Sequence, residues 1–573
     1  MAETLLSPGV LTRENDQSFI TQQPVQVGAA IVGPAVKGPV EIPTLVTSYS
    51  DYQNRFGTTF ESGSQTYTFM TSVAAYNYFN NGGTSLLVTR VVSGSTANWD
   101  YATANVTTPS SATAFTLEAI DKGVIWNNAG TATSGSLDSG SVDNVRWQIT
   151  TANTSSGTFS LVVRRGNDNN NNPVILESYP NVSLDPNQDN YIARVIGDTY
   201  FNYNSTENYL EVTGSFPNRS RYVRVSSVNL PTPNYFDNAG IAKDIYTGSI
   251  PVVGSGSANG SFSGGTGNVI PSGRVMNLYQ NINATDSQGL VGADYNDMLS
   301  LLANQDDYRF NALFTPGITN ATHASQTTTA INNTQGRGDS IYILDPVAYG
   351  ATIGATTDES NSRNTSYAAM YWPWLQTVDP DSGQNVWVPA STMIPGVFAY
   401  NDSVSEPWFA PAGINRGGLT NVIRPERKLS QSNRDTLYES NINPIASFPG
   451  VGTVVYGQKT LQKQASALDR VNVRRLLIAL KSYIGQVSQT LVFEQNTAAT
   501  RNNFLSIVNP YLESVQQRQG LYAFKVVMDD SNNTPDVIDR NQLVGAIYLQ
   551  PTKTAEFIIL DFNVLPTGAT FPG

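Results

Sequence analysis

The chain has 573 residues, and about 100–200 residues per domain would divide it into three to five units. Only 14% of the residues are charged and the net charge is −12, so a general binder of nucleic acid or of anionic membranes is not expected. The sequence has no cysteine and one histidine, His323, which excludes disulfides and thiolate metal sites and argues against a histidine metal cluster or a catalytic triad.

Residues 1–27 are mostly polar, and Pro8-Gly9 interrupts them, so we predict an extended N-terminal arm. The first residues lack the basic and apolar segments of a secretory signal. The sequence also has no run of apolar residues long enough to span a membrane, and we expect no membrane-spanning segment.

The next segment, 28–93, has the pattern of an α/β unit. Strands are predicted at 29–32, 44–47 and 85–92, and apolar residues at helical spacing between Phe69 and Phe79 predict a helix that ends at Gly82-Gly83. The order strand, helix, strand favours a parallel sheet covered by helices.

Residues 94–293 are rich in Ser, Thr, Asn and Gly, and we interpret them as a β-rich insertion into the α/β domain. The stretch 158–179 predicts a hairpin. The glycine-rich stretch 254–267 lacks the lysine of a phosphate-binding loop, so we interpret it as a flexible loop. The α/β pattern resumes over 294–420, with strands near 308–318 and 339–347 and a helix between them.

A C-terminal α+β domain is predicted over 421–554, followed by a strand or arm at 555–573. Helices are expected at 465–496 and 498–518, followed by β-type segments. In the first helix an apolar stripe lies beside Arg470, Arg474 and Lys481, which fall within about 40° of one another on the helical wheel. These three side chains form either a solvated face or a docking face for an acidic partner.

Other possible sites have little support in the sequence. We expect His323 at the surface, and we interpret Arg337-Gly338-Asp339 as a turn rather than an adhesion motif. No pair of carboxylates has a spacing that indicates a glycosidase.

Several stretches resemble the tail sheath proteins of contractile bacteriophages. They include "SPGVLTREND" at the N-terminus, "VGAAIVGPAVKGPVEIPTLVTSYSDYQNRFG" after it, and "LDRVNVRRLLIALKSYIGQVSQTLVFEQN" near the C-terminus. The resemblance covers nearly the whole chain in the same order. It departs before the "WFAPAG" motif, where Asn401, Asp402 and Glu406 stand in place of an arginine-rich segment that the family often has.

The resemblance implies a structural subunit and not an enzyme, with no catalytic, cofactor or metal residues. Such subunits form hexameric rings stacked helically around a tail tube, and contraction drives the tube through the host envelope. The implied partners are further copies of the chain, the tube protein, and baseplate and tail terminator proteins, with no nucleic acid and no direct membrane insertion. The implied location is the virion tail, assembled in the host cytoplasm.

The arms would join neighbouring subunits by β-strand addition, in which a strand of one chain completes a sheet of another. Within "AEFIILDFNVL", alternate residues form one wholly apolar face, which suits such a strand. The predicted strand-pairing residues are Val10, Leu11, Thr12, Arg13, Glu14, Phe557, Ile558, Ile559, Leu560, Asp561 and Phe562. The C-terminal domain and arms would lie inside the sheath, with Arg470, Arg474 and Lys481 facing the tube and the insertion outside.

Two alternatives stay open at this point. A sheath from a phage-derived contractile injection particle would have the same mechanics. A secreted β-rich adhesin or glycan hydrolase would need an export signal, and the sequence shows none.

Overall fold

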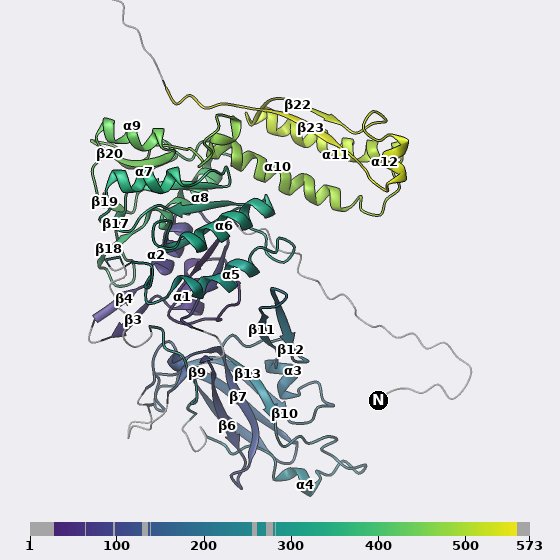
Figure 1. Cartoon of the computed structure of the whole chain (residues 1–573). Coiled ribbons are helices and arrows are strands. Elements are labelled where there is room, and N and C mark those ends of the chain that lie inside the picture. The colour runs from purple at the N-terminus through teal and green to yellow at the C-terminus, as the bar shows by residue number, and fades with distance from the viewer. Residues whose placement is uncertain are drawn as a thin grey trace, which may run out of the picture.

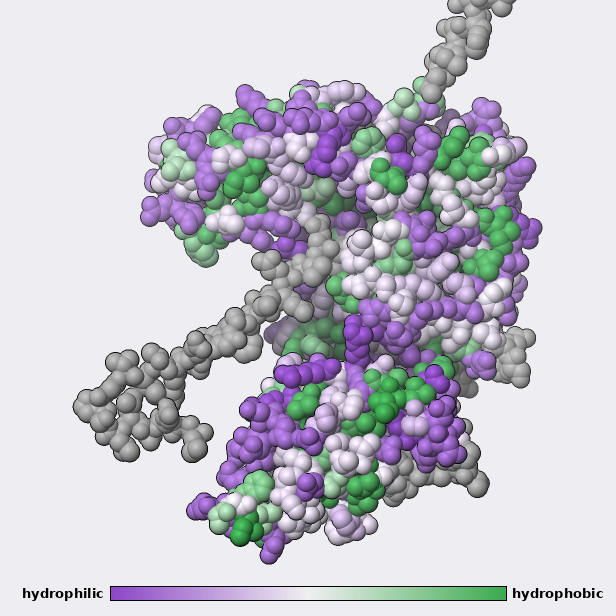
Figure 2. Space-filling view, turned by 180° about the vertical axis from the view of Figure 1, so that it is seen from behind, coloured by the Kyte–Doolittle hydropathy of each residue, from purple (hydrophilic) through white to green (hydrophobic). Residues whose placement is uncertain are grey.

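A computed structural model describes residues 28–557, apart from 63–64, 95–97, 129–135, 138, 255–259, 271–278 and 281. The described chain has three parts (Figure 1). A middle α/β domain carries the β-rich insertion below it, and a helical hairpin with a small sheet lies across its top. From behind, apolar residues are scattered in small groups among polar ones (Figure 2).

The middle domain is built on an eight-stranded sheet in the order β2-β5-β1-β14-β15-β16-β20-β21. Six neighbouring strands, from β5 to β20, run parallel, and the strands at the two ends pair antiparallel. Every residue of β1, β5, β14, β15 and β16 is buried, as expected for a parallel sheet covered on both faces. The strands span Ala29–Gly33 (β1), Thr44–Val46 (β2), Leu86–Arg90 (β5), Ala312–Thr319 (β14), Ile341–Asp345 (β15), Ala368–Trp372 (β16), Ile442–Phe448 (β20) and Gly452–Val455 (β21).

Helices cover both faces of this sheet, each over its own apolar cluster. One face has α1 (Tyr49–Phe56), α2 (Met70–Asn80) and α8 (Ile394–Val404). The other has α5 (Asn296–Leu301), α6 (Ala324–Arg337), α7 (Ile353–Asn361) and α9 (Gln431–Glu439). Two small sheets complete the domain, formed by β3 (Thr59–Ser62) with β4 (Gln65–Thr68), and by β17 (Leu375–Val378) with β18 (Asn385–Val388) and β19 (Val422–Pro425). The α/β unit predicted from 28–93 is therefore confirmed.

The insertion has its own core between two three-stranded antiparallel sheets. The hairpin predicted at 158–179 is confirmed, because β9 and β10 pair antiparallel. The first sheet has β6 (Tyr101–Thr107), β7 (Thr113–Lys122) and β13 (Val223–Val228), and the second has β8 (Val145–Asn153), β9 (Thr158–Arg165) and β10 (Ile175–Ser183). A hairpin of β11 (Tyr200–Asn204) and β12 (Tyr209–Thr213) packs on the middle domain, and the short helices are α3 (Ile192–Ile196) and α4 (Asp244–Thr247).

The C-terminal part is a helical hairpin packed on a two-stranded sheet. The apolar stripe predicted in the first helix faces this core, and Tyr483 stacks on Tyr511 with their ring centroids 3.8 Å apart. Because α10 also contributes to the core of the middle domain, it belongs to both parts. The elements are α10 (Val471–Gln489), α11 (Ala498–Gln517), β22 (Leu521–Val527), α12 (Pro535–Asp539) and β23 (Ala546–Pro551), and 3₁₀ turns elsewhere span Val124–Trp126, Gly292–Tyr295, Ala390–Thr392 and Ala467–Asp469.

The structure corrects the predicted boundary at 421. β20 pairs in parallel with β16, and β21 pairs with β20, so the middle sheet extends to Val455. The sequence could not show this, because the pairing joins segments about seventy residues apart along the chain. None of the described helices is long and apolar enough to cross a membrane.

Two smaller predictions had different outcomes. His323 is not at the surface: it is 2% exposed at the start of α6, with Nδ1 2.7 Å from the Thr322 hydroxyl. The turn at 337–339 is confirmed, because Gly338 has a φ of 73° and Arg337 folds back onto Asp339 with an N–O distance of 2.9 Å.

Candidate functional site

The two-stranded sheet of the C-terminal part has edges that no other described strand covers. In the described part of the chain, β22 and β23 pair with each other and with no third strand. Their inner faces pack on the helical hairpin, whereas Tyr522 and Tyr548 are 63% and 62% exposed. Unpaired backbone N–H and C=O groups at a strand edge can pair with another extended chain.

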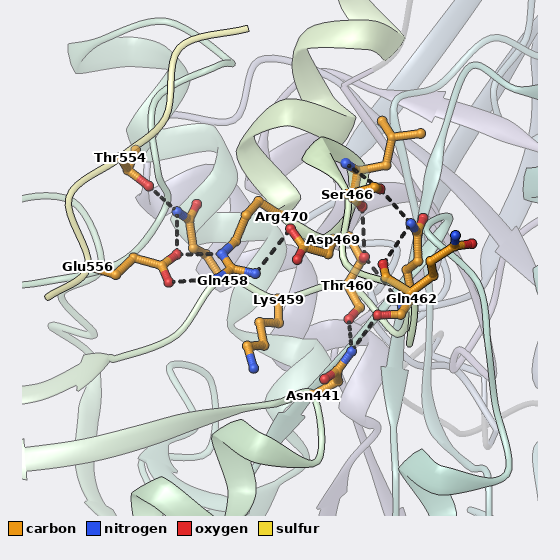
Figure 3. A network of polar contacts seen from close by, with 12 residues as sticks. Asn441, Gln458, Lys459, Thr460, Gln462, Ser466, Asp469, Arg470, Thr554 and Glu556 are labelled. Atoms are coloured by element: carbon orange, nitrogen blue, oxygen red, sulfur yellow. Dashed lines mark hydrogen bonds and ion pairs between the residues drawn. The ribbon is translucent and has the colours of Figure 1, made fainter.

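The chain leaves this sheet through residues 552–557, which a single carboxylate holds against the middle domain (Figure 3). Glu556 accepts hydrogen bonds from Arg470 Nε and Nη2 at 2.7 and 3.0 Å. It also accepts from the Tyr438 hydroxyl at 2.7 Å and from Gln458 Nε2 at 3.1 Å. Gln458 Nε2 donates to the Thr554 hydroxyl as well, at 2.6 Å. We call this set of residues the Glu556 clamp.

The clamp assembles residues from separate segments. Tyr438 lies on α9, Gln458 follows β21, and Arg470 immediately precedes α10. Burial alone would raise the pKa of Glu556, but the hydrogen bonds from Arg470 and Tyr438 and the charge of Arg470 outweigh it and hold that pKa below its usual value. The carboxylate therefore stays ionised and paired at neutral pH.

A second contact joins the C-terminal part to the last turn of α8 and the loop that follows it. Asp402 pairs with Arg475 at 2.5 Å, and Glu406 pairs with Arg518 at 2.8 Å. Trp408 is buried in the core of the C-terminal part and donates from Nε1 to the Arg518 carbonyl at 3.0 Å. Asp402 and Glu406 are two of the residues that the sequence marked as a departure from the expected family pattern. Here they bind Arg475 of α10 and Arg518, which directly follows α11.

Arg470, which precedes α10, and Arg474 and Lys481 within it are in different environments. Arg470 is held in the Glu556 clamp. Arg474 is 3% exposed, and its guanidinium lies 3.9 Å from the ring centroid of Tyr367. Lys481 is exposed, with Nζ 3.3 Å from the Tyr367 hydroxyl. Of these three residues, Lys481 is therefore the one whose exposed side chain could contact a tube protein. Contact with the tube stays a prediction.

The predicted strand-pairing residues lie almost entirely outside the described part of the chain. Residues 10–14 and 558–562 are not described, and Phe557, which follows the clamp directly, is 79% exposed. Their pairing stays a prediction. The sequence pattern pointed to Arg470 but not to Glu556, Tyr438 or Gln458, and the only signal for Glu556 was one acidic residue before an apolar run.

Comparison with known families and structures confirms the resemblance found in the sequence. Residues 289–461 match the phage tail sheath protein central domain, and residues 463–565 match the phage tail sheath C-terminal domain. The break between the two matches lies just after β21, where the central sheet ends.

Curated relatives include the tail sheath protein of Vibrio phage KVP40, which is 41% identical over 246 residues, or 43% of this chain and 36% of that protein. The tail sheath protein of Enterobacteria phage T4 is 40% identical over 225 residues, or 39% of this chain and 34% of that protein. The matched regions thus span about a third of the length of these relatives.

The fold of the chain is also similar to a solved structure. The crystal structure of a sheath tail protein from Listeria innocua matches with a TM-score of 0.52 at 10% identity, over 92% of this chain and 95% of that one. This likeness supports the fold alone, whereas the two domain matches and the curated relatives carry the assignment. The chain belongs to the phage tail sheath family.

Proposed function

We propose that this chain is the subunit of a contractile tail sheath. Copies would stack as hexameric rings around a tail tube, and shortening of the array would drive the tube through the host cell envelope for genome delivery. The observation that carries the proposal is the open-edged β22–β23 sheet beside an exit segment fixed by the Glu556 clamp. This arrangement suits a subunit that exchanges strands with its neighbours.

Strand exchange would hold the rings together. Residues 10–14 of one copy and 557–562 of another would add to the edges of a third copy's β22–β23 sheet through main-chain hydrogen bonds. The clamp supports this idea because it fixes the place from which the C-terminal segment leaves each subunit. Fixing that point reduces the conformational freedom that the segment loses on pairing.

The energy for contraction would be stored in the assembly. We propose no catalytic step and no nucleotide, because the extended array would be a metastable state kept by a kinetic barrier. The further partners would be the tube protein and the baseplate and tail terminator proteins, in a virion tail assembled in the host cytoplasm. A phage-derived injection particle would use the same subunit mechanics.

Two truncations test the role of the C-terminal strand. A chain ending after Thr554 loses the clamp and the strand, whereas a chain ending after Phe557 keeps the clamp and loses only the strand. We expect both to be folded and neither to form sheath tubes when examined by negative-stain microscopy. Contractile tubes built by the longer truncation would contradict the strand-exchange proposal.

Tube contact through Lys481 is tested by Lys481→Glu. The control is Lys428→Glu, because Lys428 is also exposed but lies between β19 and α9. We expect Lys481→Glu to slow sheath growth on purified tubes and to leave tube-free polymerisation unchanged, with neither effect for the control. Equal growth of both variants on tubes would show that Lys481 is only solvated surface.

An enzymatic role would appear in a different assay. Release of sugars from host surface polysaccharide by the purified chain would contradict the structural role.

A further inference from the structure

Two apolar side chains are exposed in the turn that joins α10 to α11. Phe493 has a relative exposure of 103%, the largest among the large apolar residues that the structure describes, and Val492 beside it is 60% exposed. The backbone of Phe493 has a φ of 71°, a region that bulky side chains rarely adopt. The fold gains no packing from this ring. Exposed apolar side chains that gather at one place mark contact sites for other proteins.

The turn is part of an acidic end of the C-terminal part. Asn496 Nδ2 donates to Asn533 Oδ1 at 3.2 Å and to the Gln542 carbonyl at 2.9 Å, so residues 492–496 lie against the segment 528–545. These two stretches hold five acidic residues and one basic residue, Arg540. The acidic residues are Glu494, Asp529, Asp530, Asp536 and Asp539. We call the two stretches together the acidic tip.

A surface with unpaired arginines lies on the middle domain. The guanidinium of Arg434, on α9, is 5.2 and 5.8 Å from the ring centroids of Phe448 and Tyr456, and Tyr456 is 48% exposed. The loop that hydrogen-bonds along β21 adds Ile414, which is 62% exposed, and Arg416. We call these five residues the arginine face.

Both arginines of this face are free to meet a carboxylate. Arg434 donates to the Leu429 carbonyl at 3.2 Å, and Arg416 donates to the Ala410 carbonyl at 3.1 Å. Within the described part of the chain, neither forms an ion pair with an acidic side chain. The arginine face therefore combines exposed apolar surface with positive charge, and the acidic tip combines exposed apolar surface with negative charge.

The acidic tip and the arginine face lie too far apart to meet within one chain. Figure 1 shows α12, which belongs to the tip, at one end of the top of the molecule and α9 at the other. From behind, the end with the helical hairpin overhangs the middle domain (Figure 2). Complementary surfaces at opposite ends of a subunit join copies head to tail, and such contacts close into rings or continue as helical arrays.

We propose that the acidic tip of one copy docks on the arginine face of a second copy of this chain, with Phe493 packed against Tyr456 and Ile414. Glu494 would then lie near Arg434. Aromatic side chains and arginine are enriched at the centres of protein interfaces, and opposite charges select the partner and its orientation. The inference rests on the proposed function, in which copies assemble into rings, and it adds a contact between folded surfaces that is separate from strand exchange.

Crosslinking between substituted cysteines tests this contact, because the chain has no cysteine of its own. Gln495→Cys and Asn415→Cys place thiols at exposed positions beside Phe493 and Ile414 and remove neither docking side chain. The two full-length chains, carrying different affinity tags, are mixed in equal amounts and treated with a short bismaleimide. We expect mixed dimers at least about tenfold more often than when Asn415→Cys is replaced by Asn238→Cys, an exposed asparagine of the insertion.

Further substitutions separate docking from folding. Phe493→Asn, added to the Gln495→Cys chain, should lower the yield of mixed dimers at least about tenfold. Its thermal unfolding midpoint should equal or exceed that of the parent chain, because asparagine adopts a positive φ more readily than phenylalanine does. Glu494→Arg on the same chain should also lower the yield, and Arg434→Glu on the partner chain should restore it, because the reversed pair again has opposite charges.

The inference fails if the test pair crosslinks no more than the control pair, if Phe493→Asn leaves the yield unchanged, or if reversing both charges restores nothing. Capture of the tip by purified tube protein, with loss of the mixed dimer, would overturn it as well. Negative-stain microscopy of the same samples separates this result from the proposed function. Sheath tubes without the mixed dimer would refute the docking alone, whereas the mixed dimer in samples without tubes would support the docking and count against the sheath.

Discussion

Replacing Glu556 by Gln tests whether one carboxylate holds the exit segment. The substitution keeps the size and shape of the side chain but removes the charge that receives the two Arg470 hydrogen bonds. Gln can still accept one hydrogen bond from Tyr438 or Gln458. Arg470 would keep Asp469, 3.1 Å away, as its remaining carboxylate partner.

The expected loss is about 2 kcal/mol. A hydrogen bond to a charged group contributes about 1.5–3 kcal/mol, and the partial exposure of the pair reduces the combined effect of two such bonds. The loss should be local, because among the described residues Thr552 alone joins the segment 552–557 to the rest of the chain by a backbone–backbone hydrogen bond, to the Gly520 carbonyl at 3.2 Å. About 2 kcal/mol corresponds to a roughly 30-fold larger population of the open segment.

Limited trypsin digestion measures this opening at Lys553, which is exposed and lies within the exit segment. When opening and closing are fast compared with cleavage, the rate follows the population of the open form, so Glu556→Gln should be cut about 30 times faster. Glu513→Gln, an exposed position on α11, is the matched control and should be cut at the parent rate. A rate for Glu556→Gln within twofold of the parent would refute the clamp.

The other predictions concern the fold around this site. Asp402→Asn should lower the free energy of unfolding by about 2 kcal/mol in urea, because Arg475 is 5% exposed and would lose its carboxylate; a change below about 0.5 kcal/mol would contradict the pairing. Burial raises the pKa of Asp345 to about 7, so the folded chain binds its proton more tightly than the unfolded chain does. Stability should therefore fall as pH rises from about 4 to 7, by no more than about 4 kcal/mol from this group, and Asp345→Asn should flatten that part of the pH profile; an unchanged profile would contradict it. The Glu556 clamp should depend on pH in the opposite direction, because the pKa of Glu556 is lowered in the folded chain. Protection of the exit segment from proteases should be full above about pH 4.5 and should be lost as the pH falls through the lowered pKa.

The sequence predicted the elements of the α/β domain well because their signals are local. Strands such as 341–345 are short apolar runs, and the apolar stripe of α10 follows the helical period. The boundary at 421 was wrong for the opposite reason. β20 is a strand of the middle sheet only because β16 lies beside it, and no pattern within 421–455 contains that information.

The site was harder to predict because its residues act through partners far away in the sequence. The helical wheel placed Arg470 and Arg474 on one side of the predicted helix 465–496. It could not show that Glu556 covers the first and Tyr367 the second. Buried charges such as Arg474 are exceptions to the rule that arginine lies at the surface, and they are recognised only when their partners are known. The same holds for Asp402, which the sequence marked only as a departure from the family pattern.

The ion pairs at the top of the middle domain bear on how a sheath subunit could move. Tilting the C-terminal part against the middle domain would separate Asp402 from Arg475 and Glu406 from Arg518, and would pull Trp408 out of the core of the C-terminal part. Breaking the Asp402–Arg475 pair, whose arginine is buried, costs about 3 kcal/mol, and exposing a tryptophan costs about as much, whereas the more exposed Glu406–Arg518 pair adds little. Such a tilt is therefore expensive for every subunit of an array. If the sheath contracts as proposed, a movement of whole subunits against one another would leave these contacts within each subunit intact. The structure therefore favours a sheath in which the middle domain and the C-terminal part of each subunit turn as one rigid unit.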